Sequence, residues 1–339
     1  MNQQQQERPI LAITMGDPAG CGPEIIVKAL SDRSIYEICR PLVFGDAKRL
    51  ALAATILNSP LHIAGLAKVA KGSFKHGTID VLDFSNIPAD LPFGQVNPQA
   101  GHAAYQYIEA AVQAAMAGEV TGVVTAPINK EALHLGGHDF PGHTEILGEL
   151  SNSHDYAMLL ASEALRVIHV TTHVSMVQAA SMITKERVLR IIRLADRTLR
   201  LLGIDQPRIA VAGFNAHAGE NGLFGREDID EIVPAVEEAC KEGMNVTGPI
   251  SPDTVFYRAA CRKEFDIVVV MYHDQGHIPI KLLGFDSGIN VTVGLPFLRS
   301  SVDHGTAFDI AGQGLAEDGS MKAAIEFAAR AANGARTAR

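Results

Sequence analysis

The sequence ILAITMGDPAGCGPE, residues 10–24, joins an apolar run to a glycine-rich turn and then to the start of a helix. The run Ile10–Met15 has the composition of a strand buried on both faces, and Pro23 stands where the first turn of a helix accepts proline. The turn, Gly16–Glu24, is not GxGxxG, because Ile25 replaces the third glycine, and it has no GK[ST]. The sequence therefore excludes a Rossmann site or P-loop here, and a tight strand-to-helix turn is a sufficient interpretation.

The same alternation of short apolar runs and helical periods continues along the 339 residues, which predicts an α/β fold with a largely parallel sheet. Further strands are expected at Leu42–Gly45, Ile79–Phe84, Val120–Ala126, Ala157–Leu160, Val167–Thr172, Arg208–Phe214, Ile267–Tyr272 and Ile289–Val293. Helices are expected at Glu24–Leu30, Pro98–Ala117, Glu145–Leu150, Lys185–Leu202, Ile229–Cys240 and Met321–Ala332. Gly203 and Gly243 stand just past two of these helices, where a C-terminal glycine belongs.

The length corresponds to about two domains at roughly 150 residues each. Crossovers between domains are expected in Ala126–Lys130 and after Pro296. We therefore expect a first domain of residues 1–128 and 300–339, and a second of residues 129–299.

The composition limits the partners and the compartment. Residues are 47% hydrophobic, the formal charge is −9 and no Lys/Arg block occurs, so no nucleic-acid partner is expected. No apolar run approaches the 18 or so residues of a membrane span. The four cysteines are widely spaced and the N-terminus lacks a signal-peptide pattern. These features predict a cytoplasmic protein with reduced thiols.

Three histidines occupy equivalent places in the sequence. His173, His217 and His273 each stand at or just past the end of an expected strand. Ligands of open α/β sheets bind outside the carboxyl ends of the strands, and three neutral imidazoles suit a divalent metal with an open coordination position. The alternative is that each is a hydrogen-bonded histidine at a strand end.

A second group of residues is suited to an anion. Lys281 and Arg299 flank the segment 284–290, and His143 and Thr144 precede Glu145 at an expected helix start. Arg and Lys give charge-assisted hydrogen bonds to phosphate or carboxylate, and a helix N-terminus favours anions. Thr144 as a helix cap and the two cations as solvated surface charges are the alternatives.

With these residues identified, the chain resembles the 4-hydroxythreonine-4-phosphate dehydrogenase family. The resemblance runs from about Ile10 to about Gly314 and is carried by five motifs in order, which are TMGDPAG with GPE at 14–24, PGHTE at 141–145, NAHAGE at 215–220, YHDQG at 272–276 and SVDHGTA at 301–307. It implies two α/β/α domains with a cleft between them, similar to isocitrate and isopropylmalate dehydrogenases and not to a Rossmann fold. It also implies a homodimer with a shared active site.

The resemblance assigns roles residue by residue. The metal ligands would be His173, His217 and His273, with His273 supplied by the partner subunit. The substrate contacts would be His143, Thr144, Lys281, Asn290 and Arg299. The loop Asp303–Gly312 resembles the adenosine loop of isopropylmalate dehydrogenases, so His304 and Asp309 would bind the cofactor. A carboxylate at Asp309 would repel a 2′-phosphate, which favours NAD over NADP.

The implied reaction is metal-assisted oxidation of the C3 hydroxyl of a four-carbon hydroxy acid 4-phosphate, followed by decarboxylation to a three-carbon keto phosphate. Asp253, Asp274 and Lys281 are the candidate acid–base residues, with a helix-start role as the alternative for Asp253. Zinc is the expected metal, with cobalt, nickel, manganese and magnesium as alternatives.

The substrate itself is a separate question. Pro141, Gln275–Pro279 and Gly284–Gly288 look more like the branch that acts on 4-phospho-D-threonate and 4-phospho-D-erythronate. The alternative within the family is 4-phosphohydroxy-L-threonine, used in pyridoxal phosphate biosynthesis. A metal-dependent lyase or phosphatase, or a non-catalytic protein that binds phosphorylated acids, are the alternatives of other classes.

Overall fold

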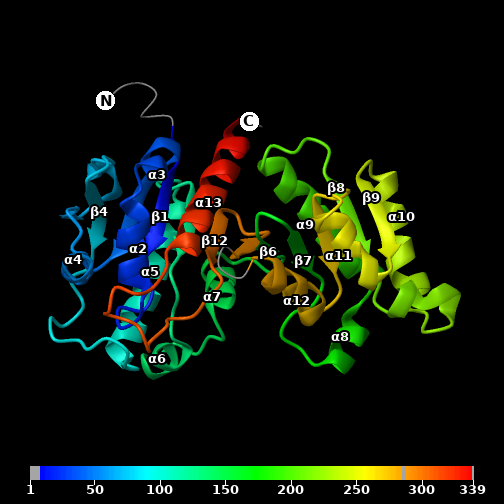
Figure 1. Cartoon of the computed structure of the whole chain (residues 1–339), viewed down its shortest axis with the longest axis horizontal. Coiled ribbons are helices and arrows are strands. Elements are labelled where there is room, and N and C mark those ends of the chain that lie inside the picture. The colour runs from blue at the N-terminus through cyan, green and yellow to red at the C-terminus, as the bar shows by residue number, and fades with distance from the viewer. Residues whose placement is uncertain (1–7, 285–287, 338–339) are drawn as a thin grey trace. The chain divides into compact units, whose positions relative to one another are not determined.

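The computed structural model describes residues 8–284 and 288–337. The predicted segment Gly284–Gly288 therefore lies partly outside the described residues. The chain divides into two compact units, which Figure 1 colours along the sequence. Unit 1 comprises the chain up to Asp155 and then Leu295–Arg336, and unit 2 is built from Tyr156–Gly294.

Unit 1 is organised around a parallel sheet. Its described strands follow the order β3-β4-β2-β1-β5-β12, and every neighbouring pair is parallel. The strands are β1 (Ile10–Thr14), β2 (Arg40–Gly45), β3 (His62–Leu66), β4 (Thr78–Asp83), β5 (Gly122–Thr125) and β12 (Leu298–Val302). All four residues of β5 are buried, which confirms the expectation of strands covered on both faces.

The α-helices of unit 1 connect these strands or follow them. They are α2 (Gly22–Leu30), α3 (Arg33–Ile38), α4 (Ala47–Ile56), α5 (Pro98–Met116), α6 (Lys130–Leu135), α7 (His143–Leu150) and α13 (Gly319–Thr337). The longest internal one, α5, begins with Pro98 and is capped by Asn97, whose side chain accepts hydrogen bonds from two backbone amides. Among the described residues, no helix is long and apolar enough to cross a bilayer.

Unit 2 has a mixed sheet whose described strands follow the order β11-β6-β7-β10-β8-β9. They are β6 (Ala157–Ala161), β7 (Arg166–His169), β8 (Arg208–Ala212), β9 (Asn245–Ile250), β10 (Ile267–Val270) and β11 (Ile289–Val293). Only β6 runs antiparallel to its two neighbours in this part of the chain. The sheet is therefore largely parallel, as the sequence predicts.

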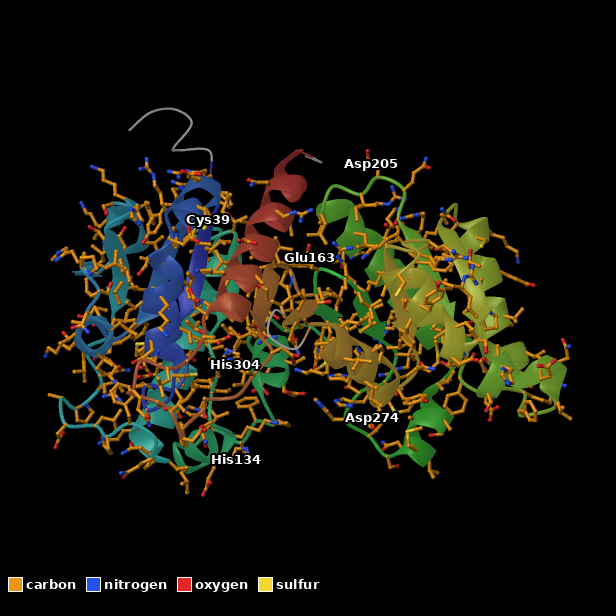
Figure 2. The ribbon with its side chains drawn as sticks, in the orientation of Figure 1. Cys39, His134, Glu163, Asp205, Asp274 and His304 are labelled. Carbon is orange, nitrogen blue, oxygen red and sulfur yellow. The ribbon has the colours of Figure 1, made fainter. Side chains whose placement is uncertain are left out.

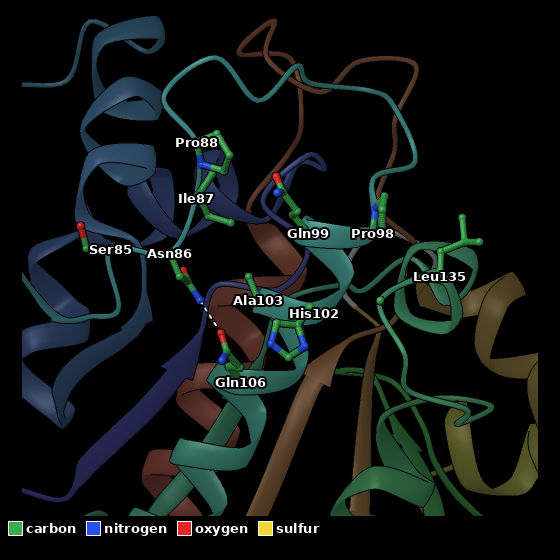
Figure 3. A pocket seen from close by; sticks show the side chains of 11 residues that line it. Ser85, Asn86, Ile87, Pro88, Pro98, Gln99, His102, Ala103, Gln106 and Leu135 are labelled. Atoms are coloured by element: carbon green, nitrogen blue, oxygen red, sulfur yellow. Dashed lines mark hydrogen bonds between the residues drawn. The ribbon is translucent and has the colours of Figure 1, made fainter.

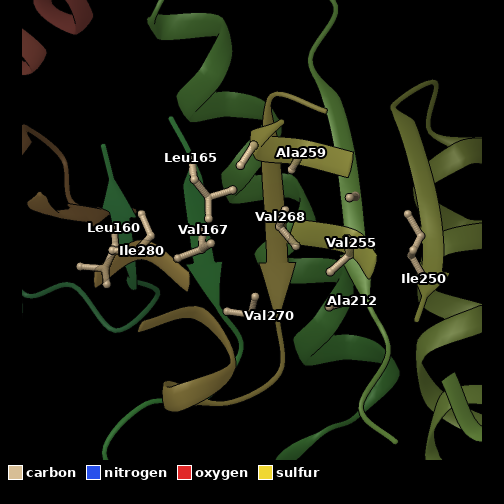
Figure 4. Close-up of a cluster of buried hydrophobic side chains, with 12 residues drawn as sticks. Leu160, Leu165, Val167, Ala212, Ile250, Val255, Ala259, Val268, Val270 and Ile280 are labelled. Carbon is tan, nitrogen blue, oxygen red and sulfur yellow. The ribbon is translucent and has the colours of Figure 1, made fainter. Parts of the chain in front are cut away.

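The helices of unit 2 pack against this sheet, and the four consecutive residues of β10 are all buried, so both faces of that strand are covered. They are α8 (Met176–Met182), α9 (Lys185–Leu201), α10 (Val233–Lys241), α11 (Pro252–Ala260) and α12 (His273–Gly284), with a π-helical turn at Asp228–Ile232. Figure 4 shows Val268 and Val270 of β10 packed with Val255 of α11 and Ile280 of α12. Burial of such side chains is the main term that stabilises the unit.

The structure corrects several element boundaries. The expected helix Ile229–Cys240 begins as the π-helical turn, because Pro234 has no N–H to continue the ladder. The expected strand Ile267–Tyr272 ends at Val270, because the Met271 amide donates to the side chain of Gln275 at 2.6 Å. Gly203 and Gly243 do follow helix ends, with φ of 84° and 86°.

The units also differ from the domains expected from the sequence. Residues 129–155, expected in the second domain, belong to unit 1, because α6 and α7 both pack against α5. The return to unit 1 comes at Leu295 rather than at residue 300.

Candidate functional site

In unit 1, the glycine-rich turn receives the segment that follows the predicted cofactor loop. The buried carboxylate of Glu24 accepts hydrogen bonds from the backbone amides of Gly312 at 2.8 Å and Gly314 at 2.5 Å. One turn later, Lys28 Nζ donates to the carbonyls of Gly314 at 2.8 Å and Ala316 at 2.7 Å. The residues that follow the turn thus hold the segment 312–316, a contact that the sequence does not reveal.

The two predicted cofactor residues lie at the surface of this loop. His304, labelled in Figure 2, is exposed, and its Nδ1 lies 2.9 Å from the Gly305 carbonyl. Asp309 is also exposed, and its carboxylate makes no hydrogen bond with the described residues. The backbone of the loop is held by the turn at residues 16–24, because the Cys21 amide donates a hydrogen bond to the Thr306 carbonyl at 2.9 Å. The carboxylate of Asp309 is therefore available to hydroxyl groups of a ligand.

A buried cation lies near the start of β12, beside β5. Arg299 is 3% exposed, and its Nη2 donates to the Thr125 hydroxyl at 2.8 Å. Burial lowers the pKa of the Arg299 guanidinium to about 9, and the nearby Glu145 carboxylate opposes that effect. The side chain therefore stays charged at neutral pH, which is what a phosphate or carboxylate ligand requires.

His143 lies close to this arginine and begins α7, with Thr144 next to it on the first turn. The ring of His143 bonds the Ala126 carbonyl, and burial together with Arg299 holds the pKa of His143 well below its ordinary value. Its Nε2 is buried and makes no hydrogen bond with the described residues. The helix begins at His143 with Gly142 as its cap, so Thr144 is not the cap considered from the sequence. A neutral imidazole and a hydroxyl thus accompany the cation.

Sequence reasoning missed one titratable group in this part of unit 1. Asp17 is fully buried and accepts a hydrogen bond from the Ala19 amide at 2.8 Å, while its own amide donates to Pro127 at 2.8 Å. Burial raises the pKa of Asp17 to about 6, against the lowering effects of the amides of Ala19 and Asn129 and of Arg49. The aspartate of a strand-to-helix turn is usually a solvated or capping residue, so this burial cannot be predicted from the sequence.

In unit 2, two of the predicted metal ligands are neighbours. The ring centroids of His173 and His273 are 5.5 Å apart, a separation compatible with two imidazoles on one ion. His273 Nδ1 lies 2.7 Å from Asp274 Oδ1. In the tautomer that carries its proton on Nδ1, this N–H donates a hydrogen bond to the carboxylate and the lone pair lies on Nε2. A carboxylate–histidine pair of this kind orients and strengthens a ligand histidine. Asp274, predicted as an acid–base candidate and labelled in Figure 2, thus lies in contact with His273.

The third histidine is presented by an unusual turn. His217, Ala218, Glu220 and Asn221 all have φ between +42° and +55°, the left-handed region that side chains avoid. Strained backbone of this kind gathers at functional sites. The turn is held by the buried Asp228, whose carboxylate accepts from the amides at 214 and 215 at 2.8 and 3.0 Å. Neither the strain nor Asp228 could be read from the sequence.

The three histidines do not form a complete metal site within one chain. The described residues contain no group of three or more His, Cys, Asp or Glu side chains that could hold a metal ion. His217 instead has Ser251 Oγ 3.4 Å from its Nδ1 and lies beside Phe224. The convergence of all three at one set of strand ends is therefore not seen in the single chain. The donor chemistry of His173 and His273 would fit a divalent metal. Their rings lie together in one chain, whereas the resemblance assigns His273 to the partner subunit.

The remaining predicted residues lie on α11, α12 and β11. Asp253 is exposed on the first turn of α11, where Ser251 is the cap, and it accepts from the Ser251 hydroxyl at 2.5 Å. That hydrogen bond holds the pKa of Asp253 below its ordinary value, which makes it a weak base. Lys281 is half-buried on α12, and Asn290 is half-buried on β11.

Unit 1 also contains an open cavity of about 700 Å³ beside α5. Figure 3 shows the carboxamides of Asn86 and Gln106 joined in its wall, with Gln99 and His102 nearby. Its lining includes neither Lys nor Arg and none of the residues predicted for the site. The cavity is therefore not suited to a phosphate.

Comparison with known proteins agrees with the motifs. The family model described as pyridoxal phosphate biosynthetic protein PdxA matches residues 37–328. The D-threonate 4-phosphate dehydrogenase of Cupriavidus necator is 50% identical over 96% of this chain and 97% of that protein. The 4-hydroxythreonine-4-phosphate dehydrogenase of Trichlorobacter lovleyi is 46% identical over 96% and 98%.

A solved structure resembles this chain in both sequence and fold. The 4-hydroxythreonine-4-phosphate dehydrogenase of Burkholderia phymatum superimposes with a TM-score of 0.86 at 51% identity, covering 96% of this chain and 98% of that one. The family match spans most of the chain, and the relatives are aligned almost end to end. The chain therefore belongs to the pyridoxal phosphate biosynthetic protein PdxA family.

Proposed function

We propose that this protein is an NAD-dependent dehydrogenase that oxidises the C3 hydroxyl of 4-phospho-D-threonate or 4-phospho-D-erythronate with the help of a divalent metal. Decarboxylation of the resulting keto acid would give a three-carbon keto phosphate. The observation that carries the proposal is the pair His173–His273 with Asp274 bonded to His273, in a chain about half identical to proteins named D-threonate 4-phosphate dehydrogenase.

The metal would be held by His173 and His273 together with His217. A divalent ion there would supply Lewis-acid chemistry to the substrate oxygens. The contribution of the chain is to keep His273 in one tautomer through Asp274, so that Nε2 carries the lone pair. Zinc suits a set of imidazole donors best, with cobalt, nickel, manganese and magnesium as alternatives.

The third ligand is the reason to propose a homodimer with a shared active site. Within one chain His217 does not join the other two histidines, so one of the three would come from the partner subunit. Exposed apolar side chains on α8 and α12, which are Met176, Val177, Ile278 and Leu282, support an interface on this side of unit 2. We place this assembly in the cytoplasm, where its four free cysteines stay reduced.

The substrate's anionic groups would be bound by the polar and charged residues predicted from the sequence. Arg299 stays cationic although buried, and His143 and Thr144 offer a neutral ring and a hydroxyl beside it. Lys281 and Asn290 are assigned to the substrate as well. Positive charge matched to phosphate orients the substrate for hydride transfer, so its loss should raise KM before it lowers kcat.

The cofactor assignment rests on the loop with His304 and Asp309. The carboxylate of Asp309 is free to accept hydrogen bonds from ribose hydroxyls, and it would repel a 2′-phosphate. We therefore expect kcat/KM for NAD to exceed that for NADP, and Asp309→Asn to reduce the ratio. Equal efficiency with the two cofactors would contradict the assignment.

The proton released from the C3 hydroxyl needs an acceptor. Asp274 is engaged with His273, which leaves Asp253 and Lys281 as candidates. The variants Asp253→Asn and Lys281→Met separate them, because the loss of a base lowers kcat and flattens one limb of the pH profile, whereas the loss of a binding residue raises KM.

The direct test is NADH formation measured with 4-phospho-D-threonate, 4-phospho-D-erythronate and 4-phosphohydroxy-L-threonine side by side. We expect the first two to be preferred, and His173→Ala or metal depletion to lower turnover by orders of magnitude with the fold retained. Preference for the third would favour the alternative function, which the 46% identity to the Trichlorobacter lovleyi enzyme supports. Product without NADH would indicate a lyase or phosphatase.

A further inference from the structure

Four imidazoles form a continuous row in unit 2, and two of them have no assigned role. His173 is followed by His273 at 5.5 Å between ring centroids, then by His277 at 3.6 Å, and then by His169 at 4.8 Å from His277. The His273 and His277 rings are nearly parallel, with an interplanar angle of 12°. Their spacing of four residues places both rings on one face of α12.

The ring of His277 is held independently of any metal. Its Nδ1 lies 3.0 Å from the His273 carbonyl, and its far side meets His169, which is 2% exposed. His169 Nδ1 in turn lies 3.2 Å from the Met158 carbonyl on β6. Gly276 allows this approach, because a Cβ at that position would lie 2.7 Å from His169 Nε2. The ring of His277 is therefore supported by contact with the buried His169.

The first turn of α12 is also fixed at its backbone. The buried side chain of Gln275 accepts from the Met271 amide at 2.6 Å and donates to the Gly213 carbonyl at 2.8 Å. Ile280, one turn later, is fully buried in the core of unit 2 (Figure 4). The backbone that carries His273 and His277 is thus rigid, and the remaining freedom of His273 lies in its side-chain torsions.

We propose that His277 is a positioning residue for His273, whose ring it holds by stacking so that Nε2 stays aligned for a divalent metal. Asp274 restrains the edge of that ring through Nδ1, and His277 restrains its face. A ligand whose ring is oriented before binding loses less rotational freedom when it binds. This inference rests on the proposed function, because it assumes that His273 is a metal ligand.

The test measures the affinity of the full-length protein for Zn²⁺ alone by titration calorimetry, with Co²⁺ absorption as a second readout. His277→Ala removes the stacked ring, His277→Leu fills the volume without a flat face, and His277→Phe restores a flat ring that has no nitrogen. His62→Ala, on an exposed residue of β3 in unit 1, is the matched control. Far-UV circular dichroism checks that each variant folds.

We expect His277→Ala and His277→Leu to lose 10–100-fold in Zn²⁺ affinity, the range seen when a residue that supports a metal ligand is removed. His277→Phe should stay within about threefold of the parent, as should His62→Ala. If His277→Ala does not fold, the comparison of Leu with Phe decides. The proposal is overturned if the Ala or Leu variant binds Zn²⁺ as tightly as the parent does. It is also overturned if the Phe variant binds Zn²⁺ as weakly as the Leu variant, because a ring nitrogen of His277 would then be required. Absence of Zn²⁺ binding by the parent would instead overturn the proposed metal site itself.

Discussion

The buried carboxylate of Asp17 should make the stability of unit 1 depend on pH. Burial raises the pKa of Asp17 to about 6 from its ordinary value of 3.8, so the folded state binds a proton more tightly than the unfolded chain does. Stability from this group is fully present below about pH 4 and is lost as the pH rises through about 6. At pH 8 the difference amounts to about 3 kcal/mol.

The variant Asp17→Asn removes the titration and keeps the oxygen that accepts the hydrogen bond from Ala19. At low pH the variant and the parent should have similar free energies of unfolding, because a protonated carboxyl resembles a carboxamide in shape. Of the full difference, about 2 kcal/mol should develop between pH 4.5 and pH 8, with the variant the more stable at pH 8. Asp90→Asn, at an exposed position, should show no such change.

Urea unfolding followed by far-UV circular dichroism measures this difference, since the chain has no tryptophan to report by fluorescence. The two units also provide an internal comparison, because a transition of unit 2 should not respond to the substitution. A stability difference between Asp17→Asn and the parent that is the same at pH 4.5 and pH 8 would refute the reasoning. So would a variant that is less stable than the parent at pH 8.

Three further predictions concern binding, packing and reactivity. Arg299→Ala should raise KM for the phosphorylated substrate about 10–100-fold, the worth of one or two charge-assisted hydrogen bonds; an unchanged KM would place Arg299 outside the substrate site. Gly101→Ala should destabilise the protein by about 2–3 kcal/mol or more in urea unfolding, because the added Cβ would lie 1.9 Å from a carbonyl oxygen of α6. Gly305→Ala, whose Cβ would have open space around it, should cost under about 0.5 kcal/mol. In the native protein the exposed Cys240 and Cys261 should react with Ellman's reagent. Burial raises the pKa of the Cys21 and Cys39 thiols to about 12, so these two should react only after unfolding. Four reactive thiols in the native protein would contradict the burial.

The fold could be predicted where burial follows hydrophobicity. Runs such as Ile267–Val270 are apolar and fully buried, and the sequence identified them as strands. It missed β12, because Arg299, Ser300 and Ser301 are polar yet buried. Their polar groups find partners only in the folded unit, as when the Ser300 hydroxyl donates to the Ala324 carbonyl at 2.7 Å. It also missed β3, which is largely exposed at the end of the strand order.

The candidate site shows the same limit. Strand-end position predicts that His173, His217 and His273 converge, and in the single chain the rings of His173 and His273 lie 5.5 Å apart. The place of His217 depends on a left-handed turn and on Asp228, neither of which leaves a periodic signal. Likewise, the acid–base prediction for Asp274 could not anticipate its hydrogen bond to the adjacent histidine, since neighbouring residues on a helix usually point apart.

The contact of Glu24 and Lys28 with residues 312–316 has a consequence for the order in which the chain folds during synthesis. These two side chains emerge from the ribosome early, but their partners and the strand that pairs with β5 are among the last residues to be made. Unit 2 is a single continuous stretch and can complete its sheet while unit 1 still lacks β12. A released chain that ends at residue 294 should therefore resist protease in its second half and remain sensitive in its first.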